Sequence, residues 1–239
     1  INQNLAKWNS VTGVYATLDM KDASDRVSVT LVGELFRDVP KLLKALIACR
    51  TTHTELPTGE ILPLKKFAPM GSALCFPVEA LVFFALAKAI KEINGIKGSV
   101  YVYGDDIIVP SALSRFLFEL FPHYGLKFNE DKCFTVGFFR ESCGFDAYKG
   151  EKITPVRMRK VIPWSLKQAK ELVATVDFSN RLYERGYWRA AAYLRTCLSF
   201  AGVNTYTSPT VEFGGLSYTS FTSKGVTTEG KTRFNPDLQ

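Results

Sequence analysis

The sequence predicts an α+β fold, with an antiparallel sheet and packed helices over residues 1–160 and a mostly helical part over residues 161–239. Two runs of β-branched and aromatic residues flank Gly104–Asp106, which is typical of a tight β-hairpin. Apolar residues recur at helical spacing in several other segments. After Pro163 the pattern becomes helical, so we expect a boundary near residues 159–163.

The segments before the hairpin follow from the same patterns. Residues 14–19 are expected to form a buried strand, and residues 22–39 a helix that Pro40 stops. Residues 41–69 are mixed and contain the turn signal Leu56–Glu60 between two strand-like runs. A long helix is expected over residues 71–92, after a glycine-containing loop.

After the hairpin, Ser111 is expected to cap a helix that reaches about Tyr124. The last forty residues are rich in Thr, Ser and Gly and are expected to form loops or an extended tail. The remaining expected elements are strands at 134–136, 143–149 and 153–158, and helices at 165–176, 178–185 and 188–200.

The composition is that of a globular protein with 239 residues and a net charge of +7. The basic surplus favours a polyanionic partner without requiring one. Five widely separated cysteines and two histidines exclude a Cys-x-x-Cys zinc site and catalysis by several histidines. No apolar run reaches the ~18 residues of a membrane span, so no membrane partner is expected.

We expect three carboxylates to carry the chemistry. Asp105 and Asp106 are adjacent at the expected turn, and Asp19 ends the expected strand before it. Carboxylates held together are stable when they bind a divalent cation, and two such ions suit in-line phosphoryl transfer. Two alternatives stay open: Gly104–Asp106 is a hairpin turn and no more, and Asp19 is a helix N-cap.

Five segments occur in the order found in the palm of RNA-directed RNA polymerases. The chain most resembles the replicase catalytic subunit of small positive-strand RNA phages, the levivirus group, from about residue 14 to residue 160. The matching segments are Ala16–Asp25, Met70–Glu79, Tyr103–Asp106, Asn129–Phe134, and Phe139–Gly144 followed by Thr154–Pro155.

The resemblance implies a polymerase palm over residues 1–160, with a fingers-like insertion at about residues 41–69. A helical, thumb-like region with a loop-rich tail is expected over residues 161–239. The fingers that precede the first motif in the family are largely missing here. Since the chain also starts at Ile1 without a methionine, we expect it to be a fragment of a longer polypeptide.

The resemblance also implies the catalytic and metal-binding residues. Asp19 and Asp105 are the expected principal ligands of two Mg²⁺ ions, with Asp106 beside them, and Mn²⁺ is expected to substitute. Lys132 is the expected general acid for the leaving pyrophosphate, with an ordinary surface lysine as the alternative.

Five further residues are expected at the substrate. In the family the position of Asp25 helps to sense the ribose 2′-hydroxyl, and Gly71 and Ser72 are expected to line the same sugar pocket or to contact the template. Gly104 allows the sharp turn that brings the carboxylates close to the substrate. Arg140, with the adjacent Glu141, is expected to shape the primer grip, or to form a plain surface ion pair.

One feature departs from the family pattern, and two basic segments have a less specific interpretation. Many viral polymerases carry an asparagine on the helix of the second motif, and residues 71–93 contain none, so sugar selection is expected to use Ser72 or another group. Lys65 and Lys66 are either phosphate contacts or part of a solvated loop. Arginines interleaved with aromatics after residue 180 are expected to contact RNA, or to form an amphipathic helix pair: Arg181, Tyr183, Arg185, Tyr187, Trp188, Arg189, Tyr193 and Arg195.

The expected function is template-directed RNA synthesis, in which a 3′-hydroxyl attacks the α-phosphate of a ribonucleoside triphosphate. The expected partners are an RNA template, the nascent strand and, from the resemblance, host translation elongation factors as subunits, in the cytoplasm of an infected bacterial host. Two alternatives stay open: a reverse-transcriptase-like palm enzyme, and a palm-like fragment that binds RNA or a host factor without catalysis.

Overall fold

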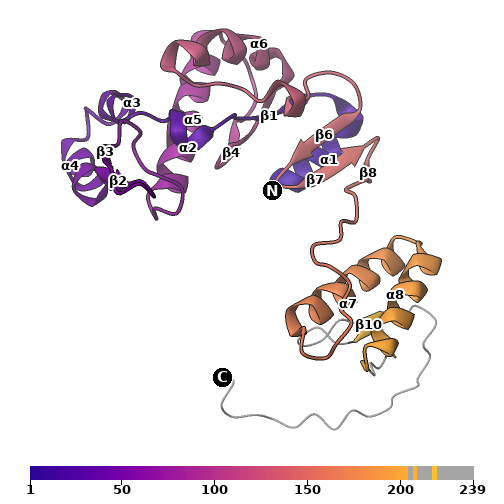
Figure 1. Ribbon diagram of the computed structural model, residues 1–239. Helices are drawn as coiled ribbons and strands as arrows, with labels where there is room; N and C mark the ends of the chain where they lie inside the picture. The colour runs from indigo at the N-terminus through magenta and orange to yellow at the C-terminus, as the bar shows by residue number, and fades with distance from the viewer. Residues whose placement is uncertain (204–206, 209–216, 220–239) are drawn as a thin grey trace. The chain divides into compact units, whose positions relative to one another are not determined.

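The computed structural model describes residues 1–203, 207–208 and 217–219, and within them the chain is a mixed α+β protein. It divides into two compact units, Ile1–Thr154 and Pro155–Gln239 (Figure 1). Among the described residues, no helix combines the length and the apolar character that a membrane span needs. The expected loop-rich tail lies mostly outside the described residues.

The first unit is built around a three-stranded antiparallel sheet of order β1-β5-β4. Strand β1 (Tyr15–Asp19) pairs with β5 (Asp106–Pro110), and β5 pairs with β4 (Tyr101–Tyr103). Both β1 and β5 expose little of either face, because helices cover the sheet. The strand at residues 14–19 and the hairpin around Gly104 were both predicted correctly.

Two long helices form the core with this sheet: α5 (Cys75–Ile93) and α6 (Ser111–Leu120). Phe83 of α5 and Leu117 of α6 are fully buried with Ile107 of β5 in one apolar cluster. Burying such side chains contributes roughly 1.5–3 kcal/mol each. This packing fixes the position of the Gly104 turn relative to α5.

A second antiparallel sheet stands beside β1. It contains β6 (Phe139–Ser142), β7 (Phe145–Tyr148) and β8 (Glu151–Lys152) in that order. Helix α1 (Asn2–Thr12) packs against β6 and β7, as Figure 1 shows. Strand β6 also contacts β1.

The other elements of the first unit are shorter. Figure 1 shows α3, α4 and the hairpin of β2 and β3 grouped together, away from β6–β8. These elements and the two 3₁₀ turns are α2 (Ala23–Arg26), α3 (Val29–Leu35), α4 (Pro40–Cys49), β2 (His53–Glu55), β3 (Ile61–Pro63), η1 (Phe121–Tyr124) and η2 (Glu130–Lys132).

Three expectations for this unit were wrong. The helix over residues 22–39 is broken into α2 and α3, and Pro40 starts α4 instead of ending a segment, as proline does at the first helical position. Ser111 does not cap α6, because its hydroxyl donates to the carbonyl of Gly13. Residues 134–136 form no strand and reach β1 only through a bridge between Phe134 and Thr17.

The second unit contains α7 (Ala169–Glu184) packed against α8 (Trp188–Phe200). Val176 and Leu198 are fully buried in its apolar cluster. The two helices expected at 165–176 and 178–185 are therefore one helix, while the helix at 188–200 was predicted correctly. The segments β9 (Thr207–Ser208) and β10 (Tyr218–Thr219) pair in parallel.

The strand expected at residues 143–149 was predicted correctly and is β7, whereas the strand expected at residues 153–158 was wrong. The observed sheet places β6 earlier, at residues 139–142, and ends at Lys152, so residues 153–158 carry no strand. The division of the chain falls at Thr154–Pro155, a few residues before the expected boundary.

Candidate catalytic and metal site

The register of the central sheet brings two expected metal ligands together. Asp19 is the last residue of β1 and lies directly opposite Asp106, the first residue of β5. Side chains of directly opposed residues lie on the same face, and like charges there destabilise a sheet. Protons or a nearby positive charge therefore stabilise this pair.

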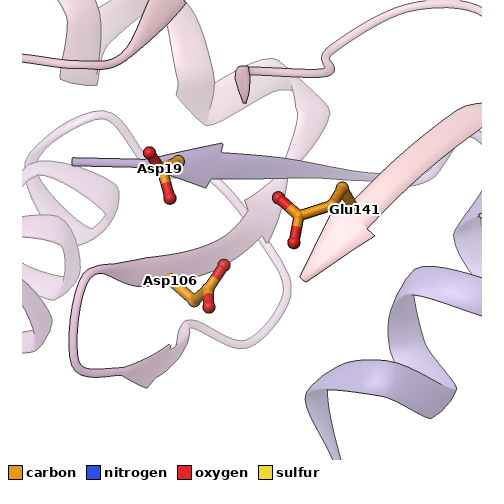
Figure 2. Close-up of side chains that lie close together, drawn as sticks. All are labelled: Asp19, Asp106 and Glu141. Carbon is orange, nitrogen blue, oxygen red and sulfur yellow. The ribbon is translucent and has the colours of Figure 1, made fainter. Parts of the chain in front are cut away.

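A third carboxylate joins this pair from β6. Oxygen atoms of Asp19, Asp106 and Glu141 all lie within 4.8 Å of one another, and Figure 2 shows the three side chains converging from three different strands. The backbone N–H of Glu141 donates to the hydroxyl of Thr17 on β1 at 3.3 Å, which holds β6 against the sheet. We call these three residues the carboxylate triad.

The electrostatics of the triad favour an added positive charge. Burial raises the pKa of Asp19, Asp106 and Glu141 above their ordinary values. The carboxylates reinforce the shift, since Asp105 raises the pKa of Asp19 and Asp106 raises that of Glu141. Hard oxygen donors in this number and spacing suit Mg²⁺, which binds through one or two carboxylates and keeps several waters. The triad therefore fits a divalent cation.

Hydrogen bonds orient the triad. The amide of Asn129 donates to Asp19 at 2.9 Å, and the backbone N–H of Cys143 donates to Asp106 at 3.0 Å. Both bonds favour the ionised carboxylate and oppose the effect of burial on the pKa. The two acidic side chains are thus held in place for ligation.

The expected general acid lies beside the triad. The Nζ atom of Lys132, in η2, lies 3.7 Å from a carboxylate oxygen of Asp19. The charge of Asp19 raises the pKa of Lys132 above its ordinary value, with smaller contributions from Glu141, Asp106 and Asp105. Lys132 is therefore protonated at neutral pH and partly exposed.

The Gly104–Asp105 turn closes the site. Gly104 has a φ of +61°, and a Cβ atom there would lie 2.6 Å from the ring of Phe76, so a larger residue does not fit without movement. The carbonyl of Asp105 accepts a hydrogen bond from Met20 at 3.1 Å. Asp105 is outside the carboxylate triad, although its charge contributes to the raised pKa of both Asp19 and Asp106.

A pocket of about 490 Å³ opens on the other side of this turn. It is lined by Asp25, Gly71 and Ser72, which were expected at the substrate, together with Asp105 and Glu79. We call it the acidic pocket. Asp25 is paired there with Lys66, so Lys66 has a partner within the protein.

Glu79 was not among the expected site residues. It lies on α5 and is 8% exposed. Burial raises the pKa of Glu79 to about 7, and the nearby Asp105 carboxylate is the second cause of this shift. Its place at the end of the second matching segment was the signal that could have identified it.

Arg140 is not placed for the expected substrate contact. Its side chain is fully buried, and its guanidinium donates to the backbone carbonyl of Tyr15 at 2.9 Å and to those of Gly137 and Phe139. It forms no ion pair with Glu141 in the described part of the chain, so the expectation of a surface pair was wrong as well. Arg140 instead ties β6 to β1, which positions Glu141.

Two arginines of the second unit, Arg181 and Arg195, have partners inside that unit. Arg181 pairs with Asp177 at 3.0 Å, and the guanidinium of Arg195 packs on the rings of Tyr183 and Tyr218. Trp188 is 63% exposed at the start of α8. The expected RNA contact of this region stays a prediction.

A family model and several curated relatives match this chain. The family model described as "RNA replicase, beta-chain" matches residues 1–184. The chain is 38% identical over 162 residues to the RNA-directed RNA polymerase beta chain of Escherichia phage MS2. This alignment covers 68% of this chain and 29% of the phage protein. It is 40% identical over 169 residues to the RNA-directed RNA polymerase subunit beta of Qbeta virus (strain MX1). This alignment covers 70% of this chain and 28% of the viral protein.

Among solved structures, a foamy viral protease-reverse transcriptase in complex with an RNA/DNA hybrid overlaps 79% of this chain and 27% of that chain. The TM-score is 0.45 and the sequence identity 13%. The chain spans 28–29% of the length of the two phage relatives described above.

Proposed function

Because the chain belongs to the RNA replicase beta-chain family, we propose that it carries the catalytic centre for RNA synthesis from ribonucleoside triphosphates on an RNA template. The observation that carries this proposal is the convergence of Asp19, Asp106 and Glu141 beside the Gly104–Asp105 turn. Nucleotidyl transfer needs divalent cations held by carboxylates, and the triad has the donor atoms for them.

The proposed ligands of two Mg²⁺ ions are Asp19, Asp105 and Asp106, and we add Glu141 from the geometry. Mg²⁺ when bound lowers the pKa of an attacking hydroxyl and neutralises charge on a leaving pyrophosphate. Mn²⁺, which also prefers oxygen ligands, is expected to substitute.

Lys132 has a separate role in this proposal. We propose that it donates a proton to the departing pyrophosphate, and its partial exposure and its distance of 3.7 Å from Asp19 support this role. Gly104 lets the carboxylates approach the substrate closely. Asp25, Gly71 and Ser72 contribute the acidic pocket that receives the incoming nucleotide.

The domain roles and partners are proposals of the same kind. The first unit is proposed as a polymerase palm with a fingers-like insertion at residues 41–69, and the second as a thumb-like region. The proposed partners are template and nascent RNA, and host translation elongation factors as subunits. The names of the phage relatives, "beta chain" and "subunit beta", support assembly with other subunits. The proposed setting is the cytoplasm of an infected bacterium.

The test is ribonucleotide incorporation on an RNA template by the complete replicase polypeptide that contains this sequence, purified with its accompanying subunits and Mg²⁺ or Mn²⁺. Asp106→Asn is expected to reduce incorporation by about 100-fold or more, because it removes a charge that acts at the transition state. The matched control is Asp38→Asn, whose side chain is 93% exposed and outside the site.

Each outcome distinguishes the readings left open by the sequence. Incorporation that Asp106→Asn abolishes and Asp38→Asn preserves supports the proposal. A preference for deoxyribonucleotides supports a reverse-transcriptase-like enzyme instead. Absence of any incorporation, when the protein is folded and binds Mn²⁺, supports a palm that binds RNA without catalysis.

A further inference from the structure

The positive charge of the chain is concentrated in one segment. Residues 155–170, which open the second unit, contain five Lys or Arg and no Asp or Glu, while the whole chain has a net charge of +7. We call residues 155–170 the basic segment. All of its basic side chains are exposed, namely Arg157, Arg159, Lys160, Lys167 and Lys170. Most of the basic surplus of the chain therefore lies on the surface of a segment that contributes nothing to the carboxylate triad or to the acidic pocket.

These charges are not neutralised within the part of the chain that the structure describes. No carboxylate there lies within 4 Å of the cationic nitrogen atoms of the basic segment, whereas Lys66, Lys132 and Arg181 each have an acidic partner. Like charges that follow one another along a chain repel, and such segments are commonly interaction sites. A row of phosphates would remove this repulsion, because each cation can replace a counterion of a nucleic acid strand.

The backbone of the basic segment is held against the helices of its own unit. Between β8 and α7 it forms neither helix nor strand, as Figure 1 shows. The carbonyl of Arg157 accepts a hydrogen bond from Nη2 of Arg181 on α7 at 3.4 Å. A Cβ atom built on Gly202, just after α8, would lie 3.4 Å from Cδ1 of Leu166. The cationic side chains are therefore presented from an anchored backbone, and binding requires less ordering of the chain.

An exposed tryptophan lies between the cations. The backbone N–H of Trp164 donates to the side-chain oxygen of Gln168 at 3.0 Å, while the Trp164 side chain is 76% exposed. Lys160 precedes it by four positions and Lys167 follows it by three. Cations interleaved with exposed aromatic rings are typical of surfaces that bind single strands, where bases stack on the rings. A duplex offers phosphates but keeps its base faces stacked inside, so Trp164 favours an unpaired strand.

We propose that the basic segment binds single-stranded RNA, with its cations on phosphates and Trp164 stacked on an unpaired base. The inference deepens the proposed function and rests on it, since RNA is chosen as the polyanion because the chain belongs to the RNA replicase beta-chain family. The contact is separate from the reaction centre, because no residue of the basic segment belongs to the triad or lines the acidic pocket. Its contribution is affinity for the strand.

The first experiment measures the salt dependence of binding. The complete replicase polypeptide with its accompanying subunits is titrated against a fluorescent, unstructured oligouridylate between about 50 and 200 mM salt. The test variant combines Arg157→Gln, Arg159→Gln and Lys160→Gln. The control variant removes the same charge from three exposed lysines elsewhere in the chain: Lys7→Gln, Lys41→Gln and Lys97→Gln.

The test variant is expected to bind about tenfold more weakly at low salt. The slope of log K against log salt concentration is expected to fall by about 2, because each phosphate contact on a single strand contributes about 0.7. The control variant is expected to change the affinity by less than about threefold, since distant charges are screened.

The second experiment isolates stacking. Trp164→Ala is expected to weaken binding of the oligouridylate by about tenfold and to leave the salt slope unchanged, because a stacked ring releases no counterions. Binding of an RNA duplex is expected to stay the same, and Trp164→Phe is expected to retain most of the affinity for the single strand. Losses with Trp164→Ala that are equal for the single strand and the duplex would overturn the stacking contact.

The outcomes are distinct from those of the proposed function. If the wild-type protein incorporates ribonucleotides and both test variants bind the oligouridylate like the control, this inference is wrong and the proposed function stands. Unchanged RNA binding with loss of the accompanying subunits from the purified complex would also overturn it, in favour of a protein partner. If the folded protein binds RNA through the basic segment but incorporates nothing, the proposed function fails and this inference stands.

Discussion

Replacing Arg140 by methionine is expected to loosen the contact between β6 and β1. Arg140 is fully buried, and its Nε and Nη1 atoms donate to the carbonyls of Tyr15 and Phe139 at 2.9 and 2.6 Å. Methionine fills much of the same space but leaves these acceptors without a donor. An orphaned buried acceptor costs about 1–3 kcal/mol.

The net effect is smaller than the sum of the lost hydrogen bonds. Burying a guanidinium without a carboxylate partner is itself unfavourable, and burial lowers the pKa of Arg140. In addition, Nη2 has no hydrogen-bond partner in the described residues. The carbonyls of Tyr15, Val136, Gly137 and Phe139 all lose this donor, and with the offset from the removed guanidinium we expect a destabilisation of about 2–4 kcal/mol.

Hydrogen exchange measures this effect locally. Amides in peptides that cover β1 and β6 are expected to exchange roughly 30- to 1,000-fold faster in Arg140→Met, since about 1.4 kcal/mol corresponds to a tenfold change. The control is Arg37→Met, at a residue whose side chain is 70% exposed and whose ion pairs are worth at most about 1 kcal/mol. Exchange in Arg140→Met that matches the control within threefold would refute the reasoning.

Three other substitutions probe the site. Gly104→Ala is expected to destabilise the first unit by about 2 kcal/mol or more, because the new Cβ atom would clash with Phe76 and the φ of +61° is unfavourable for alanine. The control is Gly137→Ala, where φ is +70° but no atom lies within 4 Å of the new Cβ atom, so only the unfavourable backbone conformation destabilises the protein. Thermal unfolding compares the two variants. Glu79→Gln is expected to stabilise the protein at pH 8 but not at pH 4.5. The pKa of Glu79 is about 7 in the folded state and 4.5 ordinarily, so between these values the folded state binds more protons than the unfolded state. The wild-type protein therefore loses about 1–3 kcal/mol of folding free energy as the pH rises through this range, and glutamine removes that loss. Urea unfolding in a chelator at both pH values measures this, and equal effects at the two would contradict it. Lys132→Met removes a positive charge 3.7 Å from Asp19, so Mn²⁺ binding followed by electron paramagnetic resonance is expected to tighten while incorporation falls about 100-fold or more; parallel losses in both would exclude a proton-donor role.

The sequence predicted the central part of the fold because each strand there is a short, mostly apolar run rich in β-branched and aromatic residues. Val14–Asp19 and Tyr101–Pro110 have this pattern, with a glycine turn in the second segment. The pairing of Asp19 with Asp106 did not follow from these patterns. Register depends on how buried faces pack against α5 and α6, and no single segment encodes it.

Glu141 was misjudged because no strand was expected over residues 139–142, where β6 lies. The observed turn between β6 and β7 consists of Cys143 and Gly144, which have φ values of +52° and +68°. Two central residues with positive φ are typical of a two-residue hairpin, and Cys-Gly is a weaker signal for it than Asn-Gly. With the turn there, alternation along β6 places Arg140 in the interior and Glu141 on the face of the triad.

The helix boundaries at Pro40 and at residues 177–178 were predicted wrongly for a different reason. Proline at position 40 was taken as a stop, although it is equally suited to the first turn of a helix, where its missing N–H is not needed. Residues 177–178 were taken as a break, yet α7 continues through them because neither is glycine or proline.

The antiparallel register between β1 and β5 restricts how this sequence can change length. A one-residue insertion or deletion inside either strand would turn Asp19 or Asp106 to the opposite face, so such changes are expected to be eliminated by selection. The hairpin of β2 and β3 supplies no triad residue, and all its strand residues are exposed. Insertions and deletions are therefore expected to be tolerated around residues 56–60, in the turn between β2 and β3. They are not expected to be tolerated in β1, β5 or β6, which carry the triad.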